Sequence, residues 1–457
     1  MTGCPFHPPK PPSRQGRAGI LRYLKLMRAD LLSAHPARLY RAWMAAFRTP
    51  FFRSYLCNDP ALIDLVLRER PADFPKSNRL REGLAPLLGQ SVFVTNGAQW
   101  QAQRRIIDPA FEGGRLREVF PAIWAAANAM VARLSRANVP LDIEPEASHA
   151  AADAIFRTMF SIPIEDATAS AVFDAFRRHQ RAAPIVNLAA LLPLPRWIPR
   201  PHSRATRATA REIRALITRL TEARAAEIAA GTAPDDLATK IMTTPDPLTG
   251  RCFAPAEMVD QVAIFFLAGH ETSASSLAWA LWLLAACPDW QARVADEAAR
   301  EIDPGAPDFA AIARLRLTRA VFREALRLYP PVPMMVRETT RPERLRDRDV
   351  APGAQIVLSP WHLHRHERLW DDPDAFDPAR FETDNGREGL RRAFIPFSAG
   401  PRVCPGAGFA MLEGPLMLAM VTRAFRLEVV EGRTPEPVAH LTVRARDGIW
   451  LKLTPRG

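Results

Sequence analysis

The chain has 457 residues, of which 48% are hydrophobic and 24% charged, as in an ordinary folded protein with enough apolar material for a core. It contains neither an N-terminal secretion signal nor a run of 18 apolar residues, so we expect a cytoplasmic protein. The net charge of +12 comes from arginines spread along the whole chain, which argues against nucleic-acid binding and favours an acidic protein partner. Five scattered cysteines without a C-x-x-C pair fit a reducing compartment.

The first thirty residues predict two different segments. Residues 1–16 are rich in proline and poor in apolar residues, so we expect a flexible tail before a single domain over residues 17–457. Apolar residues recur at helical spacing over residues 17–32, between basic residues. This pattern fits an ordinary packed helix and leaves open a peripheral contact with a membrane surface.

The next feature is a tryptophan and an arginine on one helix. Trp100 and Arg104 are four residues apart, so their side chains share a helix face. Taken alone, this pair fits a surface stacking contact as well as a clamp on a ligand. Residues 116–220 then read as alanine-rich helices, interrupted by the proline-rich stretch 191–201. We expect this interruption to join two mobile helices over a binding site, where ligand choice is decided.

Residues 253–286 form the longest helical pattern, with Pro255 near its start and Pro288 after its end. Its middle reads Ala-Gly-His-Glu-Thr and ends in Glu271 and Thr272. An acid beside a hydroxyl in an apolar helix is unfavourable unless both groups have partners. One interpretation is structural, with the hydroxyl bonded to a helix carbonyl and the acid paired with an arginine. The other is that the pair has a function, which the spacing alone does not identify.

A further helix over residues 318–329 carries Glu324 and Arg327, three positions apart, and Arg380 follows in a Pro-x-Arg-Phe sequence. Most such pairs are weak surface contacts. Residues 334–340 read as a strand that contains Arg337, which is either a solvated strand residue or a partner for a bound anion.

Three alternating histidines, His362, His364 and His366, suggest a metal site. Because no cysteine or carboxylate lies at ligand spacing, we do not expect zinc there.

A glycine-rich loop with one cysteine, Cys404, precedes a helix predicted to run to about residue 423. Gly400 and Gly406 permit a tight turn with the backbone close to a flat ligand. A thiol at a helix N-terminus has a lowered pKa and favours metal binding as the thiolate. Phe397 can shield the sulfur, and Arg402 can meet an anionic group of the ligand. The alternative is a buried structural cysteine in a glycine-rich turn.

This loop, F-x-x-G-x-R-x-C-x-G, resembles the haem-binding loop of the cytochrome P450 family. The sequences W-x-x-x-R, A-G-x-E-T, E-x-x-R and P-x-R-F occur in the family's order, and the resemblance covers residues 17–454. It implies the triangular P450 fold, which is mainly α with a small β-rich region. It also implies haem b (iron-protoporphyrin IX) with Cys404 as the metal ligand.

The resemblance assigns roles to the residues described above. Glu271 and Thr272 become the catalytic pair on the distal side of the haem. Glu324, Arg327 and Arg380 become a buried triad that supports the fold. The expected haem-binding residues are Trp100, Arg104, Arg337, Phe397, Arg402, Cys404 and Gly406.

The implied activity is that of a bacterial monooxygenase, an oxidoreductase that inserts one atom of O₂ into a hydrophobic substrate such as a terpenoid, carotenoid or fatty acid. About fifty residues follow Cys404, so we expect electrons from a separate ferredoxin or flavodoxin, facing Arg105, Arg391 and Arg392. A peroxide-driven enzyme of this fold would not need the acid–alcohol pair. A haem sensor or electron carrier would not need a distal proton relay.

Overall fold

The computed structural model describes residues 6–16, 19–48, 53–112, 114–182, 202–439 and 441–456. Its contacts divide the chain into two compact units. Unit 1 comprises Met1–Phe74, Ala127–Ser148 and Thr272–Gly457, and unit 2 comprises Pro75–Ala126 and His149–Glu271. The expectation of a single domain over residues 17–457 therefore stays a prediction.

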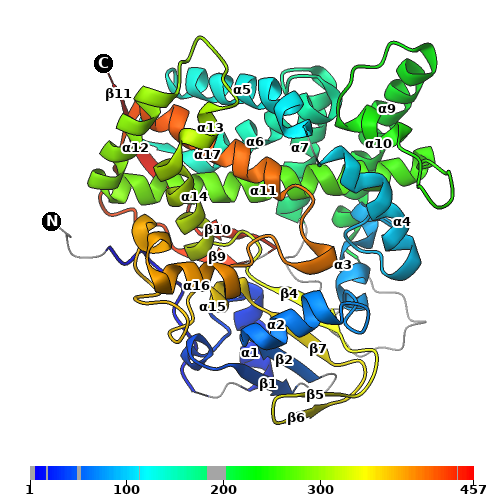
Figure 1. Cartoon of the computed structure of the whole chain (residues 1–457), viewed down its shortest axis with the longest axis vertical. Helices are drawn as coiled ribbons and strands as arrows, with labels where there is room; N and C mark the ends of the chain where they lie inside the picture. Colours follow the sequence, from blue (N-terminus) through cyan, green and yellow to red (C-terminus); the bar gives the residue numbers. More distant parts are fainter. Residues whose placement is uncertain are drawn as a thin grey trace. The chain divides into compact units, whose positions relative to one another are not determined.

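Unit 2 is built from helices (Figure 1). They are α3 (Asn78–Leu88), α4 (Gly97–Ile107), η3 (Asp108–Ala110), α7 (Ala167–Ala182), α9 (Arg204–Ala230), α10 (Leu237–Thr243) and parts of α5 (Arg115–Leu134), α6 (Ile143–Phe160) and α11 (Pro255–Ala286). The expected long helix is confirmed as α11, which begins at Pro255. The proline-rich stretch 191–201 lies outside the described residues.

Unit 1 contains the remaining described helices (Figure 1). They are α1 (Ile20–Ala29), η1 (Ala37–Tyr40), α2 (Pro60–Asp64), η2 (Leu65–Glu69), α12 (Pro288–Glu301), α13 (Ala311–Arg314), α14 (Arg316–Leu328), α15 (Pro360–Leu363), η4 (Pro378–Glu382), α16 (Asp384–Arg392), η5 (Gly400–Arg402) and α17 (Ala407–Ala424). Several side chains of α1 lie outside the description, so its expected membrane contact stays a prediction. In the described part of the chain, every helix is too short or too polar to cross a lipid bilayer.

All the described strands belong to unit 1. A four-stranded sheet has the order β1 (Met44–Arg48), β2 (Arg53–Cys57), β7 (Gln355–Leu358) and β4 (Met335–Glu338), with only β2 and β7 parallel among these pairs. A three-stranded sheet joins β3 (Leu141–Asp142), β11 (Trp450–Pro455) and β8 (Phe425–Val429). Two ribbons pair β9 (Pro437–Ala439) with β10 (Val443–Ala445), and β5 (Glu343–Leu345) with β6 (Arg348–Val350). Together with the helices, they confirm a mainly α fold with small β sheets.

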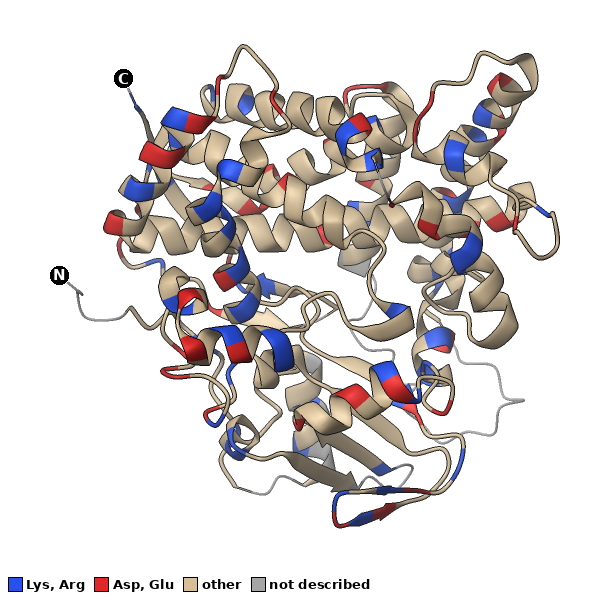
Figure 2. Cartoon of the chain, in the orientation of Figure 1, with Lys and Arg blue, Asp and Glu red and all other residues tan. Residues whose placement is uncertain are grey.

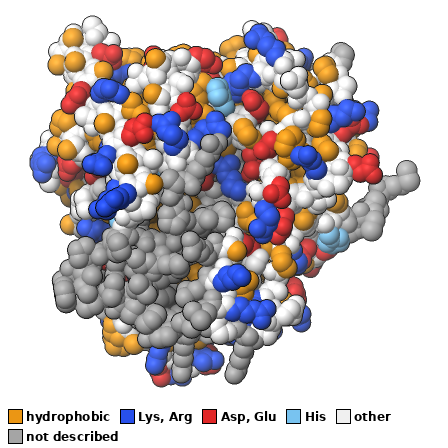
Figure 3. All heavy atoms as spheres, turned by 180° about the vertical axis from the view of Figure 1, so that it is seen from behind, with side chains coloured by type: hydrophobic (Ala, Val, Ile, Leu, Met, Phe, Trp, Pro, Cys, Tyr) orange, Lys and Arg blue, Asp and Glu red, His pale blue; other side chains and the backbone are white. Residues whose placement is uncertain are grey.

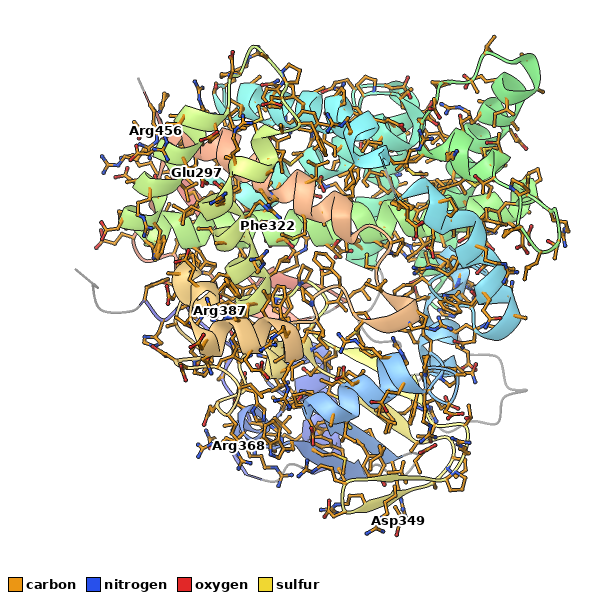
Figure 4. The ribbon with its side chains drawn as sticks, in the orientation of Figure 1. Glu297, Phe322, Asp349, Arg368, Arg387 and Arg456 are labelled. Atoms are coloured by element: carbon orange, nitrogen blue, oxygen red, sulfur yellow. The ribbon has the colours of Figure 1, made fainter. Side chains whose placement is uncertain are left out.

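Helices α12, α14 and α17 pack together and fix the helix that follows Cys404. Glu297 of α12 accepts hydrogen bonds from the first backbone amides of α14, those of Leu317 and Thr318, both at 2.8 Å. It therefore stabilises the start of α14 by charge and by hydrogen bonding. At Gly414 of α17, a Cβ atom would lie 2.1 Å from the ring of Phe322 on α14, so only glycine permits this approach. Figure 4 labels Glu297 and Phe322.

The proline-rich segment before α1 contacts unit 1 over its described part. The hydroxyl of Tyr329 donates to the carbonyl oxygen of Pro9 at 2.7 Å, and Phe6 forms a β-bridge with Phe376. The ring of His7 lies 2.9 Å from the carboxylate of Asp372. These contacts join the described part of the segment to the rest of unit 1, and the flexibility expected for residues 1–16 stays a prediction.

The expected triad of Glu324, Arg327 and Arg380 is present and buried. Arg327 donates two hydrogen bonds of 2.7 Å to the Glu324 carboxylate, and Arg380 donates one of 2.8 Å. Burial opposes ionisation of Glu324, but the two guanidinium groups outweigh it and hold its pKa below the usual value. Arg327 also donates to three backbone carbonyls, those of His364, Pro373 and Ala375. The triad therefore ties α14 to the segments that precede α16.

We expect Glu324→Ala to lower the free energy of unfolding by about 3–5 kcal/mol, because it leaves two buried guanidinium groups without their counter-ion. Urea denaturation of the haem-loaded protein measures this loss. The control is Arg387→Ala on α16, a change at a side chain that is 57% exposed and labelled in Figure 4, with an expected effect of about 0.5 kcal/mol or less. Equal losses in the two variants would contradict the structural role of the triad.

Candidate active site

The cysteine loop belongs to unit 1 and leads directly into α17. The backbone amide of Cys404 donates to the carbonyl oxygen of Phe397 at 2.9 Å, and that of Val403 donates to Gly400 at 3.0 Å. These bonds close the loop, and Cys404 is exposed at its end. A thiolate in this position lies near the N-terminus of α17, where the helix dipole favours negative charge.

Two glycines of the loop have different local environments. Gly400 has a φ of +66°, and a Cβ atom there would lie 1.9 Å from the carbonyl oxygen of Leu67 in η2. Only glycine therefore allows the loop to pack on this backbone. At Gly406 a Cβ atom would stand 3.9 Å from the sulfur of Cys404, which is ordinary contact distance. A side chain would therefore fit at Gly406, and its expected role beside a flat ligand stays a prediction.

Arg337 of β4 is a buried cation. Its relative exposure is 4%, and its guanidinium donates a 3.2 Å hydrogen bond to the carbonyl oxygen of Val336. Among the described residues, no carboxylate lies within ion-pair distance of it, and burial lowers its pKa to about 10. The alternative of a solvated strand arginine is therefore wrong. A buried guanidinium needs an anion, and a haem propionate has the required charge and bidentate geometry.

Trp100 and Arg104 lie on α4 in unit 2, whereas the other expected haem-binding residues belong to unit 1. The Arg104 guanidinium forms a 2.7 Å ion pair with Asp108, one turn further on. Burial raises the pKa of Asp108 even though Arg104 opposes the shift. The neighbouring Arg105 makes two hydrogen bonds to Asp246, of 2.6 and 2.8 Å, and holds the pKa of that carboxyl well below its usual range. Asp246 thus engages the Arg105 guanidinium, whose side chain is 30% exposed, and the expectation that Arg105 faces a protein partner stays a prediction.

The acid and the alcohol of the expected catalytic pair follow each other in the middle of α11. Glu271 is 8% exposed, and its carboxylate accepts a 2.8 Å hydrogen bond from the side-chain amide of Gln180 on α7. The sequence offered no signal for this contact, because the two residues are far apart in the chain. The carbonyl oxygen of Thr272 accepts a hydrogen bond from the hydroxyl of Ser276 at 2.8 Å, within the same helix.

The glycine and histidine before the pair are packing residues. A Cβ atom at Gly269 would lie 2.5 Å from the side chain of Ile155 on α6, so glycine allows the two helices to approach closely. His270 is fully buried, and its Nδ1 lies 2.7 Å from the carbonyl oxygen of Phe266. The rings of Phe173 and Phe176 lie about it, with centroid distances of 6.2 and 6.0 Å.

The residue that follows this pair in α11, Ser273, contacts a buried acid on another helix, to which the sequence analysis gave no chemical role. Glu413 of α17 is 1% exposed, and the hydroxyl of Ser273 donates to its Oε2 at 2.7 Å. Burial raises the pKa of Glu413 to about 8. The signal in the sequence was a single acid inside the apolar stretch of α17. Its partner is 140 residues away and could not be read from the sequence.

Because the pKa of Glu413 rises from 4.5 to about 8 on folding, the folded protein holds a proton that the unfolded chain releases. Stability should therefore fall as pH rises from about 4.5 to 8, by at most about 1.4 kcal/mol per pH unit from this group. Glu413→Gln, which mimics the protonated acid, should remove this decline. Urea denaturation of both proteins from pH 5 to 8.5 tests it, and parallel curves would contradict it.

The three alternating histidines have structural partners. The Nδ1 of His362 lies 2.8 Å from the hydroxyl of Ser359, and the ring of His366 stacks on Trp43 at 4.4 Å. His364 accepts a 2.9 Å hydrogen bond at Nε2 from the backbone amide of Ile395, and burial lowers its pKa to about 3. Among the described residues, no cluster of histidine, cysteine, aspartate or glutamate has the arrangement of a metal site.

Comparison with known proteins identifies the family. The family model described as Cytochrome P450 matches residues 52–452. Cyclooctat-9-en-7-ol 5-monooxygenase of Streptomyces melanosporofaciens is 33% identical over 387 residues, which are 84% of this chain and 82% of that protein. Cyclooctatin synthase of the same organism is 30% identical and covers 86% and 84% of the two chains. Cytokinin hydroxylase of Arabidopsis thaliana is 29% identical, with 86% and 77% covered.

The same family appears among solved structures. The crystal structure of the cytochrome P450DA heme domain superposes with a TM-score of 0.82, at 23% sequence identity, and the match covers 98% of each chain. This likeness shows the fold of a cytochrome P450 heme domain. With the family-model match, it establishes that the chain belongs to the cytochrome P450 family. The protein is a cytochrome P450 monooxygenase, and its family binds haem through a cysteine thiolate.

Proposed function

We propose that this P450 binds haem b through Cys404 and hydroxylates a hydrophobic, terpenoid-like substrate. The reaction consumes the substrate, O₂, two electrons and two protons, and forms the hydroxylated product and water. The observation that carries the proposal is the closed loop that presents Cys404 at the start of α17. When bound, the haem supplies the activation of O₂, and donation from a thiolate ligand favours cleavage of the O–O bond.

In this proposal the remaining site residues bind and orient the haem. The buried guanidinium of Arg337 pairs with one propionate. This propionate provides the negative charge, because no described carboxylate of the protein forms an ion pair with Arg337. Arg402 and the pair of Trp100 and Arg104 serve the propionates as hydrogen-bond donors. Phe397 covers the sulfur and limits access of water, and Gly406 leaves room for the macrocycle.

Glu271 and Thr272 handle the protons. The hydroxyl of Thr272 donates toward the distal side, and the carboxyl of Glu271 resupplies the proton that is lost there. The burial of Glu271 in an otherwise apolar helix supports this role, since a buried acid in such surroundings needs a reason. A peroxide-driven reaction would not require either group.

The substrate class is argued from relatives and from the sequence. The relative that shares 33% identity is named for oxidation of cyclooctat-9-en-7-ol, and the segment Leu412-Glu413-Gly414-Pro415 is similar to one in bacterial terpenoid and carotenoid hydroxylases. We therefore favour a terpenoid, with a carotenoid or fatty acid as alternatives. Titration of a lipophilic library against the haem absorption distinguishes these classes through the low- to high-spin shift that a substrate induces.

P450 enzymes need electrons from a redox partner, and we propose a separate ferredoxin or flavodoxin in the cytoplasm. The exposed Arg391 and Arg392 of α16 are 74% and 57% accessible, and both lie near Glu388. Figure 2 shows that basic and acidic residues alternate along α16. The face in Figure 3 also mixes charged and hydrophobic side chains over its described part. We propose that Arg391 and Arg392 attract an acidic partner by complementary charge.

Cys404→Ser should retain little haem, because a serine hydroxyl is a weak donor at neutral pH. The carbonyl complex of the reduced wild-type protein should have the red-shifted main absorption band typical of the family. The measurement is haem content per chain with this spectrum, alongside product formation with NADPH and a surrogate ferredoxin system. A variant that keeps both haem and the red-shifted band would show that Cys404 is not the ligand.

Thr272→Ala should bind substrate with wild-type affinity but release more peroxide, because the hydroxyl that donates on the distal side is lost. Product formed per NADPH should fall several-fold. The matched control is Ser276→Ala, one turn further along α11, which removes a hydroxyl that bonds to its own helix. Unchanged coupling in Thr272→Ala would remove this residue from the mechanism.

Reversal of charge at both Arg391 and Arg392 to glutamate should slow reduction by ferredoxin at low salt and leave substrate affinity unchanged. The difference should shrink with added salt, because the Debye length falls from about 10 Å at 0.1 M to about 3 Å at 1 M. The control makes the same charge change at Arg344 and Arg348 of the β5–β6 ribbon, which are 65% and 54% exposed. Stopped-flow rates that fall equally in both double variants would show a general charge effect instead of a docking surface.

A further inference from the structure

One face of α7 contacts α11 just before the catalytic pair. Phe173, Phe176 and Gln180 are spaced at i, i+3 and i+7, so they lie along the same side of α7. The ring of Phe176 packs on Phe266 at 4.7 Å and faces His270 at 6.0 Å. All of these residues belong to unit 2. The position of α7 therefore determines what surrounds this turn of α11.

Gln180 continues this contact by one turn and reaches the acid itself. Its Nε2 donates to Oε2 of Glu271 at 2.8 Å, which is good hydrogen-bond geometry. Glu271 is largely buried, and a bond to one of its oxygens restricts the rotation of a side chain that otherwise has several rotamers. The donor is a neutral amide.

Helix α9 holds the end of α7 that carries Gln180. The Nδ1 of His179 lies 2.8 Å from the hydroxyl of Thr209, and Arg178 forms a 2.6 Å ion pair with Glu212. Both contacts come from residues directly before Gln180. These contacts with α9 therefore hold the backbone of α7 in place next to Gln180, whose side-chain amide is the donor.

We propose that Gln180 is a positioning residue for Glu271. Its amide orients the Glu271 carboxyl so that the proton it gives up leaves toward Thr272 and is replaced from water. This role rests on the proposed function, because it assigns Glu271 to proton delivery. Gln180 itself need not touch substrate or haem.

The hydrogen bond can be tested without turnover. Gln180→Met keeps the length of the side chain and removes the donor, and Glu271→Ala removes the acceptor. In a double-mutant cycle on the haem-loaded protein, the loss of melting temperature in the double variant should be smaller than the sum of the two single losses. Additive losses would overturn the contact on which the proposal depends.

The positioning role is tested by the coupling of the enzyme, which is the amount of product formed per NADPH consumed. Gln180→Met should form several-fold less product per NADPH than wild type, with an unchanged substrate-induced spectral shift. Gln180→Arg should change the pH dependence of kcat, which a purely structural role would not. Asp174→Asn, at an exposed position of α7, is the control and should behave as wild type.

The outcomes separate two hypotheses. Wild-type coupling in Gln180→Met, with an active wild-type enzyme, would overturn the positioning role alone. A wild-type protein that forms no product from any substrate that shifts its spin state would overturn the proposed function, and this role with it.

Discussion

The buried triad of Glu324, Arg327 and Arg380 is the interaction on which the part of unit 1 around the cysteine loop depends. Arg327 bonds to the backbone of His364 through its guanidinium, and its own carbonyl oxygen lies 3.2 Å from the Nδ1 of that histidine. The second ring nitrogen of His364 accepts the amide of Ile395, two residues before Phe397. A continuous path of hydrogen bonds therefore leads from the triad to the start of the cysteine loop.

The loop itself is held at three further points. Gly400 packs on the backbone of Leu67, the amide of Cys404 bonds to Phe397, and α17 is held against α14 by the close approach at Gly414. These contacts restrain the backbone on both sides of the sulfur. A metal ligand that is restrained before the metal arrives loses less conformational entropy on binding. The fold thus favours haem binding by preorganising the loop.

The parts of the site that are local in sequence could be predicted, and the parts made by packing could not. The cysteine loop, the acid–alcohol pair and the pair of Glu324 and Arg327 each lie on one loop or helix at a fixed spacing, whereas Arg380 joins that pair from 56 residues away and was expected only from the family resemblance. The contact of Gln180 with Glu271 and that of Ser273 with Glu413 join distant segments, and no spacing reveals them. Arg337 lies between these two cases, because its strand could be predicted but its burial could not.

For Arg337, the sequence predicted the strand but could not decide between a solvated and a buried side chain, because a short strand has two faces and its cover comes from elsewhere in the chain. The ion pair of Arg105 was out of reach for the same reason. Its helix was expected, but the carboxylate that engages it lies 141 residues further on. Counting charges along a sequence therefore does not reveal which arginines are paired within the fold.

The central claim is that the sulfur of Cys404 binds the haem iron, and iron K-edge X-ray absorption of the haem-loaded protein tests it most directly. The account predicts one sulfur atom in the first coordination shell of the iron, both with and without substrate. A first shell made only of nitrogen and oxygen atoms would contradict it.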